Sequence, residues 1–232
     1  APKGETMWHG IKALLGRRQD DEIEIQRAAF GPGWLREVAY ALRTSPYLQQ
    51  NILNQRFAAT QGFSVVFQQE APFLKHFPLL EPYLTRIADP QCNVSYLNAL
   101  VLGHQGRVDR HVDHSIRGYD AKLPLPRQVW VLYVQVPLMT GGELLFYNEQ
   151  DQITREIEPE TGLLVRFPGT ARHAIREMQQ SNGETEARIS LVCEQYALSS
   201  GQRQALPEFT IKSSAGFDAF LNQALTDSSP EP

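Results

Sequence analysis

The chain has 232 residues and a formal net charge of −4, and 21% of its residues are charged. This length suits one domain with an all-β core, and the negative balance provides no overall basic field for nucleic acid or an anionic membrane. No apolar run approaches the ~18 residues that a membrane-spanning helix requires. Cys92 and Cys193 form neither a CxxC motif nor a disulfide framework, so we predict two buried, reduced thiols in a cytoplasmic protein.

Residues 1–90 are predicted to form a helical support region. After the break at Gly31-Pro32-Gly33, apolar residues recur at helical spacing. We expect these helices to pack outside a sheet of the same domain, because no flexible linker separates them from the β-rich segment after residue 90. The expected elements are a strand over residues 22–30, a helix over 34–44, an amphipathic stretch over 46–57, a strand over 63–67 and an interrupted helical region over 71–87.

Residues 91–212 have a different character, with short runs of β-branched and aromatic residues between glycines and prolines. Strands at this spacing without intervening helices indicate an antiparallel sandwich or barrel. A C-terminal helix over about 214–225 and a tail are predicted within residues 213–232. The predicted strands cover residues 93–103, 128–137, 143–147, 153–157, 163–167, 174–178, 188–196 and 209–212.

Three residues in this β region have the pattern of a metal site. His111 and Asp113 are two positions apart, so both side chains point to one face of an extended segment. His173 lies at the start of a later strand, which a barrel can bring close to the first pair. Two histidines and one carboxylate form the facial triad of non-haem Fe(II) oxygenases. Alone, the His-x-Asp pair is weak evidence, because such pairs occur by chance.

An arginine and a serine come after the second histidine in a way that suggests anion binding. Arg188 and Ser190 lie on one face of a predicted strand, one hairpin beyond His173. A guanidinium fork and a hydroxyl group that project together into a barrel form a bidentate site for a carboxylate. An arginine at the exposed start of an edge strand is the alternative, and it loses weight once the metal motif is considered with it.

Taken in order, these motifs resemble the Fe(II)- and 2-oxoglutarate-dependent dioxygenases, most closely their prolyl-4-hydroxylase-like branch. The resemblance spans roughly residues 93–196, and several motifs in the right order are more specific than any one of them. The matching stretches are His111-Val112-Asp113, Val131-Leu132-Tyr133-Val134, Gly141-Gly142-Glu143-Leu144, the run from Ile157 to Phe167 before His173, and Arg188-Ile189-Ser190.

The resemblance implies a mainly β fold with flanking N-terminal helices and a double-stranded β-helix (jelly-roll) core. It implies that His111, Asp113 and His173 bind Fe(II), and that Arg188, Ser190 and Tyr133 bind the 2-oxoglutarate cosubstrate. The expected reaction uses O₂ to hydroxylate an unactivated C–H bond and releases succinate and CO₂, with ascorbate as a supporting reductant. The expected organisation is a single oxygenase domain, with residues 1–90 as support, 91–212 as the jelly roll and 213–232 as a C-terminal helix and tail.

One part of the family's pattern is missing here. The strand that enters the first ligand often carries an aromatic residue nine or ten positions before the histidine, where this chain has Val101 and Leu102. Asn98 or His104 could replace that polar contact. Asp113 is retained, which argues against the halogenating relatives, because those have a small residue at this position.

Two other functional classes compete with the oxygenase interpretation. One is a jelly roll that binds a metal and a ligand without turnover, as a sensor, and the other is a metal-dependent hydrolase with the same triad. The pair Arg188 and Ser190 favours the oxygenase, because a hydrolase needs no dicarboxylate clamp. We expect a small molecule or a peptide as substrate, with peptidyl proline as one candidate, and no nucleic-acid partner. Residues 115–127 form either a mobile loop over the site or a plain connection.

Overall fold

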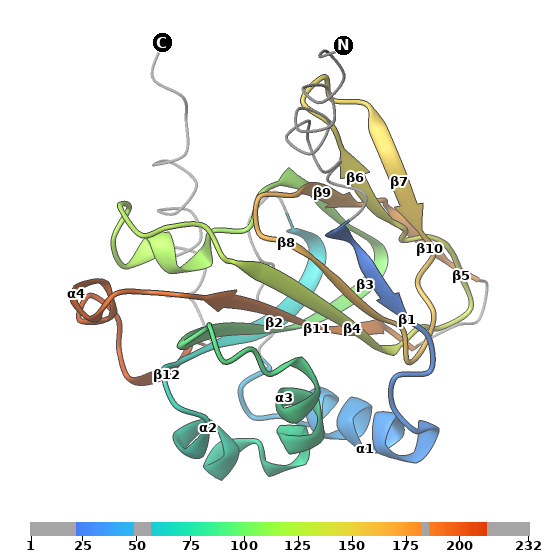
Figure 1. Ribbon diagram of the computed structural model, residues 1–232. Helices are drawn as coiled ribbons and strands as arrows, with labels where there is room; N and C mark the ends of the chain where they lie inside the picture. The colour runs from blue at the N-terminus through green and yellow to red at the C-terminus, as the bar shows by residue number, and fades with distance from the viewer. Residues whose placement is uncertain (1–21, 49–56, 182–185, 213–232) are drawn as a thin grey trace, which may run out of the picture.

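The computed structural model describes residues 22–48, 57–181 and 186–212. Strands are the most abundant regular structure in the described chain, and the helices α1–α3 come before residue 90 in the sequence (Figure 1). The elements are β1 (Glu24–Gln26), α1 (Pro32–Arg43), β2 (Phe57–Phe67), α2 (Glu70–His76), the 3₁₀ turn η2 (Pro78–Leu80), α3 (Glu81–Ile87), β3 (Val94–His111), the 3₁₀ turn η3 (Ser115–Gly118), β4 (Gln128–Gln135), β5 (Met139–Gly141), β6 (Leu144–Tyr147), β7 (Ile153–Ile157), β8 (Leu164–Pro168), β9 (Arg172–Ile175), β10 (Met178–Gln180), β11 (Arg188–Tyr196), α4 (Ser200–Arg203) and β12 (Phe209–Lys212).

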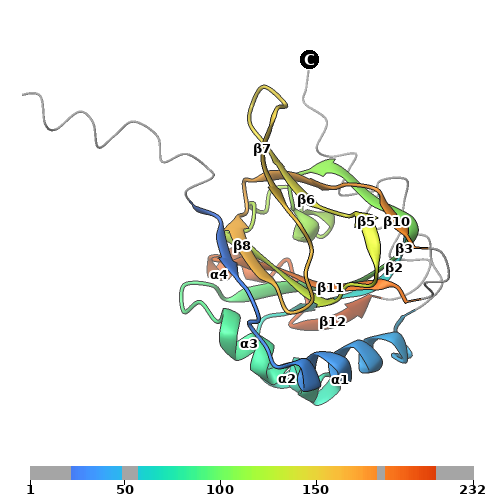
Figure 2. The same cartoon turned by 90° about the vertical axis from the view of Figure 1, so that its right-hand side faces the viewer.

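The main sheet curls back on itself around the long strand β3. Its hydrogen-bonded strands run in the order β1-β8-β4-β11-β3-β9-β6-β7, with β2 beside β3 and β12 beside β2. β2 pairs with one edge of β3 between residues 95 and 108. The other edge of β3 pairs first with β11, over residues 94–102, and then with β9, at Val108 and His111, and all of these pairings are antiparallel. β3 therefore belongs to both walls of the curled sheet, with the β6–β7 hairpin facing β11 across the interior (Figure 2). This confirms the predicted mainly β fold with a jelly-roll core.

Helices α1, α2 and α3 cover one face of the wall that contains β2, β3, β11 and β4 (Figure 1). Alternate residues of β11 point to this helical side, and Ile189, Leu191 and Cys193 are all fully buried there. The intervening residues of the strand face the interior of the curl, as the period of two in a strand requires. The apolar face under the helices thus fixes which residues of β11 line the interior, namely those at even-numbered positions from Arg188 onward.

Several strand boundaries differ from the prediction. The sequence predicts that β3 ends near residue 103, but the strand continues to His111, although Gly103, Gln105 and Gly106 interrupt its pattern. Gln105 adopts a φ of 62°, and the register with β9 shifts between Val108 and His111, so the strand bends rather than ends. The strand predicted over residues 174–178 is wrong as a single element: β9 pairs with β3 and β6, and β10 pairs with β5.

Other predictions fall partly outside the described residues. The amphipathic stretch over 46–57 ends in strand β2 at its last residue and otherwise lies mostly in 49–56, and the helix over 214–225 lies beyond residue 212. Cys193 is buried and Cys92 is half-buried, and both thiols are free. No helix among the described residues is long and apolar enough to cross a membrane.

Residues 115–127 are packed against the interior of the fold. η3 begins at Ser115, and Ile116 and Leu123 are 0% and 1% exposed. Arg117 Nε donates a hydrogen bond of 2.8 Å to the carbonyl oxygen of Leu123, which closes the segment on itself. The segment is therefore an anchored connection, and its apolar residues belong to the same core cluster as Tyr96, Leu100 and Leu102 of β3.

Candidate active site

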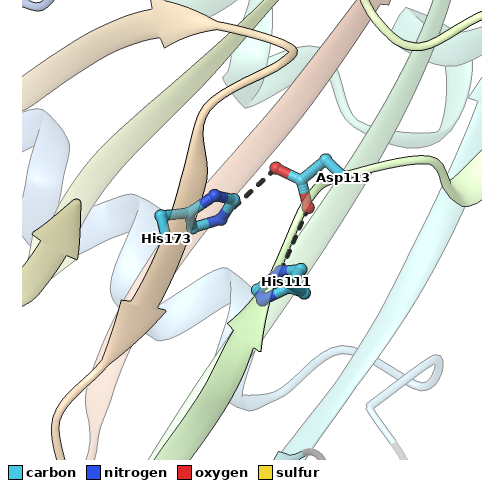
Figure 3. A group of neighbouring side chains, drawn as sticks. All are labelled: His111, Asp113 and His173. Atoms are coloured by element: carbon cyan, nitrogen blue, oxygen red, sulfur yellow. Dashed lines mark ion pairs between the residues drawn. The ribbon is translucent and has the colours of Figure 1, made fainter. Parts of the chain in front are cut away.

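His111, Asp113 and His173 converge at one end of the curled sheet. His111 is the last residue of β3, and it is the direct cross-strand partner of His173 in β9. Asp113 lies two residues after the end of β3 and turns back toward both rings (Figure 3). Its Oδ1 is 3.3 Å from His111 Nε2, and its Oδ2 is 3.5 Å from His173 Nε2. One ligand atom from each residue lies within 4.8 Å of the other two.

Backbone hydrogen bonds set the orientation of both imidazole rings. His111 Nδ1 is 2.8 Å from the carbonyl oxygen of Asp109, and His173 Nδ1 is 3.1 Å from that of Ala171. A carbonyl oxygen only accepts, so each Nδ1 carries the proton and each neutral ring directs the lone pair of Nε2 toward Asp113. Two lone pairs that face a carboxylate repel it unless a cation lies among them. The arrangement therefore suits a metal ion held by two Nε2 atoms and one carboxylate.

The carboxylate of Asp113 is nearly buried, at 9% exposure. Burial alone would raise its pKa, but positive charge on the nearby histidines, His173 foremost, outweighs burial and lowers the pKa to about 2, and a metal ion between neutral rings would act in the same direction. The side chain is therefore ionised, which is the form that binds metal. Phe167 lies beside the site, with its ring centroid 4.9 Å from that of His173, and gives it an apolar wall.

Arg188 lies on the interior face of β11 and is completely buried. Its Nη1 donates a hydrogen bond of 2.7 Å to the carbonyl oxygen of Gly142, and the guanidinium carbon lies 4.7 Å from the centroid of the Tyr133 ring. Burial lowers the pKa of Arg188, although an arginine stays charged in proteins. Its Nε and Nη2 have no hydrogen-bond partner among the described residues. These two nitrogens form one edge of the guanidinium, the edge that matches the two oxygens of a carboxylate.

Ser190 and Tyr133 extend this polar patch. They are cross-strand partners on β11 and β4, and both are buried, at 1% and 0% exposure. Neither hydroxyl group has a hydrogen-bond partner in the described part of the chain. Burial raises the pKa of Tyr133, against the opposing charge of Arg188, so its hydroxyl keeps its proton as a donor. Because unpaired buried polar groups are costly, these groups together indicate a site for an anionic ligand.

The turn before β6 contributes a contact that the sequence alone did not assign. Gly141 and Gly142 have φ values of +76° and +77°, a conformation that favours glycine. A Cβ atom on Gly142 would lie 3.3 Å from Arg188 Nη1 and 2.8 Å from the side chain of Met139. The double glycine therefore lets the backbone approach Arg188 and orient it through the Gly142 carbonyl.

The structure distinguishes the two polar residues that could replace the missing aromatic residue. His104 is exposed, and its Nδ1 accepts a hydrogen bond from the backbone nitrogen of Gln180. Asn98 pairs with Val192 of β11 on the interior side, and its Oδ1 is buried without a hydrogen-bond partner in the described chain. Val101 belongs to the cluster beneath the helices, so only Leu102 of that pair faces the interior. Asn98 is thus the better candidate for a polar contact with a ligand.

Solved structures with this fold include several oxygenases. The chain matches a prolyl-4-hydroxylase from Pseudomonas putida with a TM-score of 0.53 and 15% identity, over 78% of this chain and 97% of that one. It matches a 2OG-Fe(II) oxygenase family oxidoreductase from Burkholderia pseudomallei with a TM-score of 0.52 and 12% identity, over 76% and 85%. A third match, the protein IDO from Bacillus thuringiensis, has a TM-score of 0.53 and 13% identity, over 78% and 95%.

A curled antiparallel sheet that brings two histidines and a carboxylate together beside a buried arginine is typical of jelly-roll non-haem iron oxygenases. The sequence model of the 2OG-Fe(II) oxygenase superfamily matches residues 95–193, which include every residue of this site. Residues 95–193 are therefore similar to the 2OG-Fe(II) oxygenase superfamily, and the fold of the chain is similar to that of a prolyl-4-hydroxylase. That superfamily's reaction uses Fe(II), 2-oxoglutarate and O₂, and the match implies the same partners for this chain. No curated protein matches the chain at a significant level.

Proposed function

We propose that the protein hydroxylates an unactivated C–H bond of a small molecule or a short peptide. In this proposal His111, Asp113 and His173 bind Fe(II), and Arg188, Ser190 and Tyr133 bind the distal carboxylate of 2-oxoglutarate. The buried arginine carries the proposal, because its Nε and Nη2 lack partners among the described residues and share an interior with two unpaired hydroxyl groups. A dicarboxylate cosubstrate would supply acceptors for all of these donors.

The side chains that we assign to the metal, two imidazoles and one carboxylate, fit a divalent transition-metal ion such as Fe(II). Three protein ligands on one side leave room for a chelating cosubstrate and O₂. When bound, iron and 2-oxoglutarate supply the oxidising chemistry, in which the cosubstrate becomes succinate and CO₂ and one oxygen atom enters the substrate. The protein contributes a buried carboxylate that offsets metal charge, and two rings that backbone carbonyls hold in the ligating tautomer.

Charge and fold likeness guide the choice of substrates to test. The formal net charge of −4 disfavours a nucleic-acid substrate. The fold likeness to a Pseudomonas putida prolyl-4-hydroxylase makes peptidyl proline one substrate to test first. We place free amino acids and sugars beside it in the same panel, because the residues that would contact substrate are not defined by the cosubstrate site.

A coupled assay tests the proposed reaction. Purified protein with Fe(II), 2-oxoglutarate, ascorbate and O₂ should release succinate, and the correct substrate should both stimulate release and gain one oxygen atom by mass spectrometry. Proline-containing peptides, free amino acids and sugars are the panel, and omission of Fe(II) is the control. Protein that binds both Fe(II) and 2-oxoglutarate yet never forms succinate would instead be a binding protein without turnover.

Removal of the Tyr133 hydroxyl should weaken cosubstrate binding selectively. Tyr133→Phe deletes a buried hydroxyl that has no partner in the described chain, so the free energy of unfolding of the ligand-free protein should change little. One hydrogen bond to a charged group contributes about 1.5–3 kcal/mol, so the Kd for 2-oxoglutarate should rise roughly 10- to 100-fold. Calorimetric titration of 2-oxoglutarate into the Mn(II) form measures this. Ser190→Ala should act in the same direction, and unchanged affinity in both variants would contradict the assigned clamp.

A further inference from the structure

The interior face of β11 carries a second charged residue besides Arg188. Glu194 lies on the same face of the strand, farther from the Arg188 end, and is 1% exposed. Its carboxylate accepts two hydrogen bonds from Ser115, one from the backbone nitrogen at 3.0 Å and one from the side-chain hydroxyl. The hydroxyl of Tyr196 donates a third hydrogen bond to Oε2. Both carboxylate oxygens are therefore used within the protein.

These contacts hold the segment that carries Asp113. β3 ends at His111, so no ladder of backbone hydrogen bonds fixes the position of Asp113. The next regular element, η3, begins at Ser115, and its N-cap residue His114 offers no side-chain hydrogen bond to it. Glu194, on a different strand, supplies this acceptor to the backbone nitrogen of Ser115. Ser115 lies two residues after Asp113. A buried carboxylate thus caps η3 where a local side chain would ordinarily do so.

Glu194 is better suited to this structural contact than to metal binding. The described cluster of ligand atoms within 4.8 Å of one another contains only His111, Asp113 and His173. The three donors on Glu194 already occupy both of its oxygens, and Ser115 rather than a histidine lies against it. Ile116, the residue after Ser115, is completely buried and adds an apolar anchor on the same turn.

We propose that Glu194 is a positioning residue for Asp113, which it holds in place through Ser115. The same strand then sets both ends of the site, because β11 presents Arg188 and Ser190 to the cosubstrate and fixes the turn that presents the carboxylate to the metal. This inference rests on the proposed function, since it assumes that Asp113 binds Fe(II). Outer partners of metal ligands typically affect metal affinity 10- to 100-fold when they are lost, and we expect an effect of this size.

The test compares Fe(II) affinity with cosubstrate affinity in the 232-residue protein. Glu194→Gln keeps the shape but replaces one acceptor oxygen by an amide donor, and Ser115→Ala removes one of the hydrogen bonds. Each variant should bind Fe(II) about 10- to 100-fold more weakly in an anaerobic competition titration against a chelator. The Kd for 2-oxoglutarate, measured at saturating Mn(II), should stay within about twofold. Because both substitutions break the same contact, the double variant should lose much less than the two single losses combined.

A neighbouring residue provides a matched control for general destabilisation. Gln195 comes directly after Glu194 on β11 but faces the helices, where its side chain contacts Gln128, Trp130 and the carbonyl of Ile87. Gln195→Ala should lower the melting temperature without changing Fe(II) affinity. Folded Glu194→Gln and Ser115→Ala proteins with wild-type Fe(II) affinity would overturn the inference, and if Glu194→Gln does not fold, Ser115→Ala alone decides it. If Asp113→Ala also binds Fe(II) as the wild type does, the proposed metal site itself is wrong, which separates the two failures.

Discussion

Replacement of Asp113 by alanine is expected to abolish Fe(II)-dependent succinate formation while the sheet remains folded. The substitution removes the only carboxylate of the described ligand cluster and leaves two imidazoles to hold a divalent ion. Loss of a direct ligand should exceed the loss from an outer partner, so Fe(II) affinity should fall by more than about 100-fold. His111→Ala should behave alike, because its Nε2 is one of the two ring nitrogens that face Asp113.

Metal-dependent stabilisation separates loss of binding from loss of folding. A metal present at 100 times its Kd stabilises the native state by about 2.7 kcal/mol, and this raises the melting temperature. The wild type should show that increase with Mn(II), whereas Asp113→Ala and His111→Ala should not. His104→Ala is the control, because this exposed histidine accepts a hydrogen bond from the backbone of Gln180 and does not belong to the described ligand cluster. Full activity in either ligand variant would contradict the assignment of the metal site.

The site could be predicted largely because its chemistry depends on short-range rules. Alternation along a strand places Arg188 and Ser190 on one face whatever the rest of the fold does, and the structure has them there. The same rule predicted that the side chains of His111 and Asp113 point to one place. The structure has them together, but for a different reason. Asp113 lies beyond the end of β3, so its direction depends on the turn after the strand and not on the strand itself.

The contacts that the sequence did not reveal are those between distant segments. No local sequence pattern predicts that His111 pairs with His173. That register depends on a bend near Gln105 and on the pairing of β3 with strands in both walls of the curled sheet. Glu194 did carry a signal, because an acid at an interior position of a buried strand needs partners. Burial and the charge of Asp113 raise the pKa of Glu194 to about 8. The main partner of Glu194 is Ser115, which belongs to the turn after β3 and could not be identified from the sequence pattern.

The polar interior combines two kinds of residue with opposite effects on stability. Glu194 accepts hydrogen bonds from Ser115 and Tyr196, which offset part of the cost of its burial. Arg188 is only partly compensated, by Gly142 and the ring of Tyr133, because two of its nitrogens lack partners among the described residues. A buried group without partners destabilises the ligand-free protein, and natural binding sites commonly retain such groups because the ligand needs them.

Arg188→Met is therefore expected to weaken cosubstrate binding strongly without destabilising the ligand-free protein. Loss of one partner from a buried charge pair costs about 2–5 kcal/mol, so the Kd for 2-oxoglutarate should rise roughly 30- to several-thousand-fold. Methionine has a similar length and no charge to desolvate, and replacement of a buried charge by an apolar residue is often neutral or stabilising by about 1–4 kcal/mol. The substitution loses the hydrogen bond to Gly142 and the contact between the guanidinium and the Tyr133 ring.

A series of variants makes this expectation specific to the guanidinium fork. Arg188→Lys keeps the charge but loses the planar pair of donors, so its 2-oxoglutarate affinity should lie between those of the wild type and Arg188→Met. The free energies of unfolding without ligand should rank differently, with Arg188→Met at least as stable as the wild type. Arg166→Met is the matched control, because Arg166 contacts Glu24, Gln128 and the Trp130 ring and should leave the Kd unchanged. Calorimetric titration measures the Kd for 2-oxoglutarate, and chemical unfolding measures the stability. If Arg188→Met binds 2-oxoglutarate within a few-fold of the wild type, Arg188 does not belong to the cosubstrate site.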